Sequence, residues 1–204
     1  TTDELIPSGE TSSYRSNPIR LSEFALSRRV PEYVERSKKT AQLEKENAAG
    51  NTPQEVLEVF KQLGDVKLAE NTQIGSCIFA KKPGDGSARE QAASCQKVLG
   101  GLGNICYEYA TKRYRSNCIN WGILPFTIDK GASFDYADGD WVFVPGIRGA
   151  VKEGRETTEA TVIRKDKTEE KITLHIQGLT ENEKQIILDG CLMNYYAERM
   201  KSND

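Results

Sequence analysis

Residues 74–100, IGSCIFAKKPGDGSAREQAASCQKVLG, run from an apolar segment through a turn-rich segment into a helical pattern. The apolar residues 74–80 predict a short buried strand, and the Gly, Pro and Asp among residues 81–86 predict a loop. Four small or apolar residues then recur at helical spacing, namely Ala88, Ala92, Cys95 and Leu99. The stretch therefore predicts a strand, a loop and a helix in succession.

More strands are expected on the C-terminal side of this stretch. Residues 104–110 and 140–146 are short apolar runs typical of strands, and residues 160–165 and 171–177 predict a hairpin. Strands separated by helices, together with a hairpin, predict an α/β fold with a mixed β-sheet or barrel flanked by helices.

The remaining patterns predict helices and the division of the chain. Helices are expected over residues 31–47 and 53–63, and the capping-box spacing of Thr180 and Glu183 predicts the start of a last helix. With 204 residues, the chain is long enough for one core and an extended arm. Three parts are predicted, an irregular and functional arm, a helical linker region and an α/β domain: residues 1–30, 31–70 and 71–204.

Composition excludes several classes of protein. The formal net charge of -2 is low for a dedicated nucleic-acid binder, and no apolar run approaches the ~20 residues of a membrane-spanning helix. No secretory signal is visible. The five cysteines are odd in number and lack C-x-x-C spacing, and there is a single histidine. We therefore expect reduced thiols, a cytoplasmic setting and no metal site within this chain.

The start of the helix within residues 74–100 carries a cation. Ser87 and Glu90 have the spacing of a capping box, which would explain the serine without any ligand. Arg89, however, places positive charge in the first turn, where the helix macrodipole opposes it by a few tenths of a kcal/mol to about 1 kcal/mol. A bound carboxylate or phosphate would reverse that sign, because the amides, the hydroxyl and the guanidinium would converge on it. We expect an anion site at Ser87 and Arg89.

Three motifs, in order, resemble the C-terminal swivelling domain of the aconitase superfamily. The opening TTDELIPSGETSSYR is similar to the family's Thr-Thr-Asp segment, in which an arginine follows at the separation found here between Asp3 and Arg15. GDGSAREQAA is similar to the family's Gly-Ser-Ser-Arg-Glu turn and the helix after it. YRSNCINWGILPF is similar to the segment that follows that helix. The resemblance extends from residue 1 to at least residue 150 and is weakest over residues 31–64.

The resemblance implies roles for individual residues. Arg15, Ser87 and Arg89 would bind the carboxylates of a hydroxy di- or tricarboxylic acid. Asp3 would be the carboxylate that pairs with a histidine from another domain during acid-base catalysis. Both roles suit the residue types, since arginine gives planar, bidentate recognition of carboxylates and aspartate orients and charges an imidazole.

The sequence departs from the family at two points. Ala88 stands where family members have the serine that acts as the catalytic base. The family's 4Fe-4S cluster, a Lewis acid toward the substrate hydroxyl, is held by three cysteines of other domains, and none of the five here has matching spacing. The cluster is therefore expected on missing upstream domains of the same protein or on a separate large subunit.

The resemblance thus implies the swivelling domain of an aconitase-like hydro-lyase, which closes over the cluster domain and is inactive alone. Ala88 leaves two alternatives within the family, a redirected enzyme or a protein that has lost catalysis. The rival from another class is a carboxylate-sensing or RNA-binding relative, and RNA binding gains little support from the net charge of -2.

Overall fold

The computed structural model of the chain describes residues 1–9 and 11–203; Glu10 of the predicted arm and Asp204 at the end of the predicted domain lie outside the described residues. The chain divides into two compact units, each described here by itself. The first unit holds residues 1–78 and 86–103, and the second holds residues 79–85 and 104–204. The helix that follows the GDGSARE turn therefore belongs to the same unit as the N-terminal arm.

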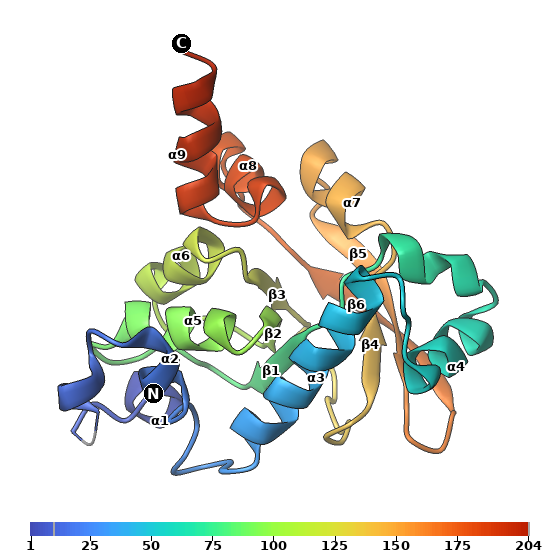
Figure 1. Cartoon of the computed structure of the whole chain (residues 1–204), viewed down its shortest axis with the longest axis horizontal. Coiled ribbons are helices and arrows are strands. Elements are labelled where there is room, and N and C mark those ends of the chain that lie inside the picture. The colour runs from blue at the N-terminus through green and yellow to red at the C-terminus, as the bar shows by residue number, and fades with distance from the viewer. Residues whose placement is uncertain (10, 204) are drawn as a thin grey trace. The chain divides into compact units, whose positions relative to one another are not determined.

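Six strands form one mixed sheet in the order β1-β2-β3-β6-β5-β4, shown in Figure 1. The strands are β1 (Ser76–Ala80), β2 (Gly101–Cys106), β3 (Leu124–Thr127), β4 (Trp141–Phe143), β5 (Thr157–Ile163) and β6 (Glu169–His175). The pairs β3–β6, β6–β5 and β5–β4 are antiparallel. The sequence predicted either a mixed sheet or a barrel. Because β1 and β4 are the two edges, the described strands form an open sheet and not a closed barrel.

Helices lie between the strands and at both ends of the chain. In the first unit they are α1 (Thr2–Leu5), η1 (Ser12–Tyr14), α2 (Pro18–Ser22), α3 (Tyr33–Ala48), α4 (Gln54–Leu63), η2 (Val66–Asn71) and α5 (Arg89–Val98). In the second unit they are α6 (Lys112–Asn120), α7 (Ile147–Glu153), α8 (Glu181–Asp189) and α9 (Leu192–Lys201). Among the described residues, none of these helices combines the length and the apolar character that crossing a membrane requires.

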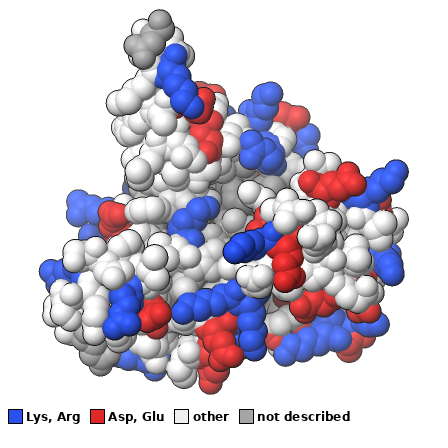
Figure 2. Space-filling model, viewed as in Figure 1, with Lys and Arg blue, Asp and Glu red and all other residues white. Residues whose placement is uncertain are grey.

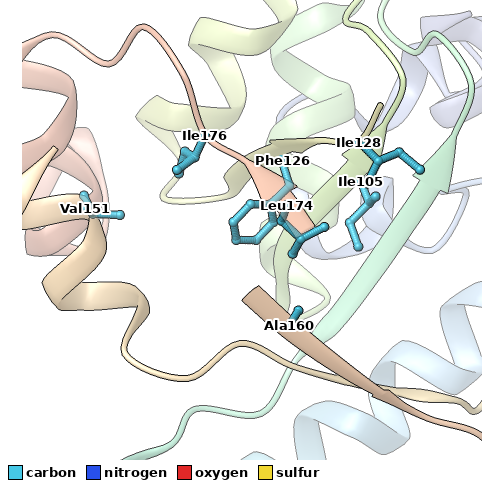
Figure 3. Close-up of a cluster of buried hydrophobic side chains, with 7 residues drawn as sticks. All are labelled: Ile105, Phe126, Ile128, Val151, Ala160, Leu174 and Ile176. Carbon is cyan, nitrogen blue, oxygen red and sulfur yellow. The ribbon is translucent and has the colours of Figure 1, made fainter. Parts of the chain in front are cut away.

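The core of the second unit joins the sheet to a helix. Figure 3 shows seven buried side chains from β2, β3, β5, β6, the residues next to β3 and β6, and α7, namely Ile105, Phe126, Ile128, Val151, Ala160, Leu174 and Ile176. Ala160 and Leu174 are fully buried on neighbouring strands. Burial of this apolar surface is the main favourable term for folding this unit.

The first unit has a small core of its own. Ala25, Tyr33 and Leu99 are buried together. Helix α5 packs against α2 and also contacts α1 (Figure 1). The arm is tied down as well, because Ile6 is fully buried and the backbone N–H of Leu26 donates to the carbonyl of Leu5 at 2.9 Å. The predicted arm is therefore a packed part of this unit.

Several predicted elements are confirmed. Helix α4 ends at Leu63, and Gly64 follows in the left-handed conformation with φ of 98°. Strands β5 and β6 pair as the predicted hairpin, and Thr180 and Glu183 form the predicted capping box at the start of α8.

Other elements differ from the sequence prediction. The single terminal helix is two helices, because Gly190 adopts φ of 98° and ends α8. The arm predicted to be irregular contains the short helix α2, where Asn17 caps the first turn and Pro18 takes the first helical position.

Candidate functional site

The turn before α5 meets α1 at a glycine. Gly86 has φ of +128°, and a methyl group on its Cα would lie 2.2 Å from the side-chain oxygen of Thr2. That distance is far below van der Waals contact, so only a hydrogen fits at this point. Thr2 is 1% exposed. The contact places Asp3, the next residue of α1, and Ser87, the next residue of the turn, on adjacent segments of the first unit.

The helix itself begins one residue later than predicted. Its first residue is Arg89, its N-cap is Ala88, and no side chain forms a capping hydrogen bond there. The predicted capping box of Ser87 and Glu90 is therefore wrong. Ser87 lies one residue before the N-cap, and only a side chain at the N-cap reaches the amides of the first turn. The first-turn amides of α5 are thus not satisfied by the serine.

Arg89 is half-buried at this helix start. Its Nε–H group is buried, and neither a hydrogen-bond acceptor nor an ion-pair partner for Arg89 occurs among residues 1–9 and 11–203. A buried donor without an acceptor costs about 1–3 kcal/mol, and more when it is charged. The positive end of the helix adds to that cost. The arrangement favours an anion, because an oxyanion would satisfy the guanidinium and the first-turn amides together.

Asp3 is held by groups of the arm. Its Oδ1 accepts hydrogen bonds from the backbone N–H and the hydroxyl of Ser8, at 2.9 and 3.0 Å, and its Oδ2 pairs with Arg28 at 2.8 Å. The Ser8 hydrogen bonds, followed by the Arg28 charge, lower the pKa of Asp3 below its ordinary 3.8. Half of its side chain remains exposed. Asp3 is therefore an ionised carboxylate that a histidine from outside the chain could still reach.

Arg15 lies directly after η1. The ring of the preceding Tyr14 stacks on Phe24, with 5.5 Å between the ring centroids, and Arg20 lies over the same ring. These contacts fix the chain immediately before Arg15. The Arg15 side chain is exposed, and within the described part of the chain it makes no hydrogen bond or ion pair.

The structure thus brings the segments that carry Asp3 and Ser87 together, whereas Arg15 lies on a separate segment after η1. Asp3 and Ser87 lie on the segments joined at the contact between Thr2 and Gly86, and Arg89 begins the helix that follows. No hydrogen bond connects Arg15 to them in the described ranges. Sequence reasoning missed the Arg28 partner of Asp3, since a separation of 25 residues leaves no local signal.

The residues of this chain do not fit an iron-sulfur cluster. No three His, Cys, Asp or Glu side chains gather as a metal site within residues 1–9 and 11–203. Burial raises the pKa values of the Cys106 and Cys118 thiols to about 12. Cluster ligands are thiolates, so burial works against that role. No step of a reaction is assigned here to a cluster on this chain.

The chain is similar in sequence and in fold to known proteins. No protein-family model matches the chain. It is 30% identical to aconitate hydratase A of Rickettsia bellii and 25% identical to aconitate hydratase A of Bradyrhizobium diazoefficiens, each over 135 residues. A crystal structure of 3-isopropylmalate dehydratase (leuD) from Methanocaldococcus jannaschii has a similar fold, with a TM-score of 0.56 and 21% identity. The resemblance to the aconitase superfamily is confirmed.

The share of each similar protein that the match covers differs between the two sequence relatives and the solved structure. The matched region covers 64% of this chain but only 15% of each aconitate hydratase. In the leuD comparison, 99% of this chain and 89% of the other chain are covered. The matched region is therefore a small part of the two aconitate hydratases, whereas the fold extends over almost the whole leuD chain.

The contact between Gly86 and Thr2 predicts a substitution effect. Gly86→Ala should lower the free energy of unfolding by about 1–2 kcal/mol for its positive φ, and by about 1–3 kcal/mol more for overpacking against Thr2. Gly50 also has a positive φ, of +87°, but nothing lies within 4 Å of a methyl group there. Gly50→Ala is thus the matched control for the backbone contribution, and urea denaturation measures both.

A second substitution tests the cause of the larger effect. Thr2→Ala removes the oxygen that the new methyl group would meet, so a double-mutant cycle with Gly86→Ala should show a favourable coupling. Equal losses for Gly86→Ala and Gly50→Ala, with no coupling, would show that the close contact is unimportant.

The Asp3 environment predicts a pH dependence. Since the folded-state pKa of Asp3 is lowered, its contacts stabilise the fold above the ordinary carboxyl pKa of 3.8 and lose that effect as the pH falls through the folded-state value. Ser8→Ala removes one donor and should raise the pKa of Asp3, which NMR titration of the side-chain carboxyl measures. Ser16→Ala, at an exposed serine outside this group, should leave it unchanged. An unaltered pKa in Ser8→Ala contradicts the assigned cause.

Proposed function

We propose that the chain is the swivelling domain of an aconitase-like hydro-lyase, which dehydrates and rehydrates a hydroxy di- or tricarboxylic acid. The names of the two aconitate hydratases and the fold of 3-isopropylmalate dehydratase support this reaction class. The chain spans 15% of the length of those hydratases, so the activity belongs to a larger assembly and this domain is inactive alone.

The observation that carries the proposal is the uncapped start of α5. Arg89 has a buried N–H group without an acceptor, and the helix amides beside it are not capped by a side chain. In the proposed complex, Arg89 and Ser87 bind one carboxylate of the substrate, and Arg15 binds a carboxylate as well. Carboxylate is the right partner, because a guanidinium fork and helix amides both donate to paired oxygens.

Asp3 acts on the proton-transfer side of the reaction. As an ionised carboxylate it pairs with a histidine supplied by another domain and orients that imidazole for acid-base work. Its hydrogen bonds from Ser8 and its ion pair with Arg28 keep it charged and in place. Asp3 therefore contributes through a group that this chain does not hold.

The assembly needs a second component. The superfamily's 4Fe-4S cluster supplies a Lewis acid for the substrate hydroxyl, and it would be carried by upstream domains of the same protein or by a separate large subunit. A cytoplasmic setting suits such an enzyme and agrees with the free cysteines of the described chain. The domain would close over the cluster-bearing component with the substrate between them.

Ala88 bears on whether the protein is a redirected enzyme or has lost catalysis. Dehydration removes a proton from carbon, and a methyl side chain cannot accept it, so another base acts or catalysis is lost. We favour a redirected enzyme, because a purely structural helix start has no use for Arg89. A carboxylate sensor is the second candidate, and the same alanine is the observation that favours it. RNA binding is disfavoured, since Figure 2 shows Lys and Arg interspersed with Asp and Glu over the face drawn.

The carboxylate site is tested on the chain alone. Citrate and succinate should bind it, and Arg89→Gln should weaken binding by about tenfold, the cost of one charge-assisted hydrogen bond. Lys39→Gln makes the same charge change on α3, at a side chain that is 74% exposed, and should have no such effect. Isothermal titration calorimetry at fixed ionic strength measures both. Equal binding to both variants, or no preference over chloride, argues against a site at Arg89.

The reaction class is tested on the complete assembly. The unmodified protein should show little citrate-isocitrate activity, and Ala88→Ser should raise kcat by about 100-fold or more, the usual contribution of a positioned acid-base group. Ala88→Val, which adds bulk without a hydroxyl, is the control. Robust activity of the unmodified protein would show that this serine is dispensable, while carboxylate binding with no activity in either form would identify a sensor.

A further inference from the structure

The second unit contains a cavity that includes none of Asp3, Arg15, Ser87 and Arg89. Its volume is about 300 Å³, near the lower end for small-molecule sites. Six residues of the wall bear on ligand binding. They supply two cations, two aromatic rings and two threonine hydroxyl groups: Lys112 and Arg115, Tyr107 and Tyr109, and Thr111 and Thr127.

Among the described residues that line the cavity, Glu108 is the one carboxylate, and it is already paired. Glu108 forms ion pairs with Lys82 at 3.3 Å and Lys130 at 3.8 Å. It is therefore not the counter-ion of the two cations that also line the cavity, Lys112 and Arg115.

Those two cations lack a negative partner of their own. Arg115 is half-buried, and its guanidinium donates to a neutral group, the backbone carbonyl of Gln177. Lys112 forms no ion pair with any residue of the described ranges, and the first turn of α6 contains no acidic residue. A half-buried cation without a counter-ion is unfavourable, so Arg115 favours an anion in the cavity. The Lys112 side chain is exposed and adds a second positive charge to the same wall.

The side chains, and not the helix end, are the basis of this site. Thr111 already caps α6, since its hydroxyl accepts from the backbone N–H of Tyr114 at 3.1 Å. Arg115 keeps further N–H groups free to bind two oxygens at once. The rings of Tyr107 and Tyr109 offer apolar walls for the carbon part of a ligand.

We propose that this cavity binds the oxyanion group of a small organic molecule, with Lys112 and Arg115 as its ligands. The shared chemistry is a carboxylate or phosphate of low molecular weight. A cavity of this size accepts such a group with a few carbon atoms, whereas a protein surface would need a broad contact area. The site is independent of the one at Arg89, and either can exist without the other.

The test uses the 204-residue chain with Arg89→Gln in the background, so that the α5 site does not contribute. Inorganic phosphate and citrate are titrated separately while backbone amide signals are followed by NMR at about 0.15 M salt, where screening acts over about 8 Å. Saturable shifts are expected for residues 112–115 and for Thr127. Saturation with phosphate alone identifies a phosphate site, and saturation with citrate alone identifies a carboxylate site.

Matched variants decide whether the cavity binds the probe. Lys112→Gln should weaken binding by about tenfold, and Lys112→Arg should restore most of it. Arg113→Gln removes the same charge from the same turn, but Arg113 is exposed and does not line the cavity, so its effect should stay below about twofold. Shifts that fail to saturate with both probes, or equal weakening by Lys112→Gln and Arg113→Gln, would overturn the proposal.

Discussion

The contact between Gly86 and Thr2 is the constraint on which the rest of the candidate site depends. It joins the arm to a turn more than eighty residues later, and the space between them admits a hydrogen but no methyl group. Thr2 is buried at this point, so α1 cannot shift outward without exposing it. Asp3 directly follows Thr2 and Ser87 directly follows Gly86, so the contact fixes the backbone at both residues. A change of one carbon atom at Gly86 would therefore separate the segments that carry Asp3 and Ser87.

The electrostatics of α5 follow from the same geometry. Because the turn is committed to meeting α1, the helix starts at Arg89 and Ser87 is left outside the capping position. The helix dipole and the guanidinium then repel each other, although Glu90 places a negative charge in the same turn. Without a bound ligand, the fold would be more stable with a neutral residue in place of Arg89. The positive charge makes physical sense once an external anion is included.

Sequence patterns predicted the elements whose causes are local. Gly64 ends α4 because glycine adopts positive φ freely, and Thr180 and Glu183 cap α8 through groups three residues apart. The hairpin of β5 and β6 followed from alternation of apolar residues. These features need no knowledge of the rest of the chain.

Most of the features that the sequence did not predict depend on contacts between residues far apart in the chain. Ser87 had the right neighbours for a cap, but a tertiary contact at Gly86 set where the helix begins. The ion pair between Asp3 and Arg28 depends on how the arm folds back on itself, which local spacing does not encode. The polar cavity beside α6 has the same origin, because its wall combines residues of α6, β3 and the segments after β2 and β6. Helix α6 itself was missed although Thr111 caps it through the amide of Tyr114, which is a local signal.

The two kinds of relative bear on what the polar residues of α5 do. In the leuD comparison this fold is nearly the whole of the other chain. In the present chain, buried apolar groups such as Ala160 and Leu174 stabilise the fold, and the buried Nε–H group of Arg89, which has no acceptor among the described residues, opposes that stability. In the aconitate hydratases the same region is 15% of a much longer protein. A buried guanidinium N–H group that no described residue accepts supports the proposed anion site at Arg89, since neither the fold nor the helix requires the charge.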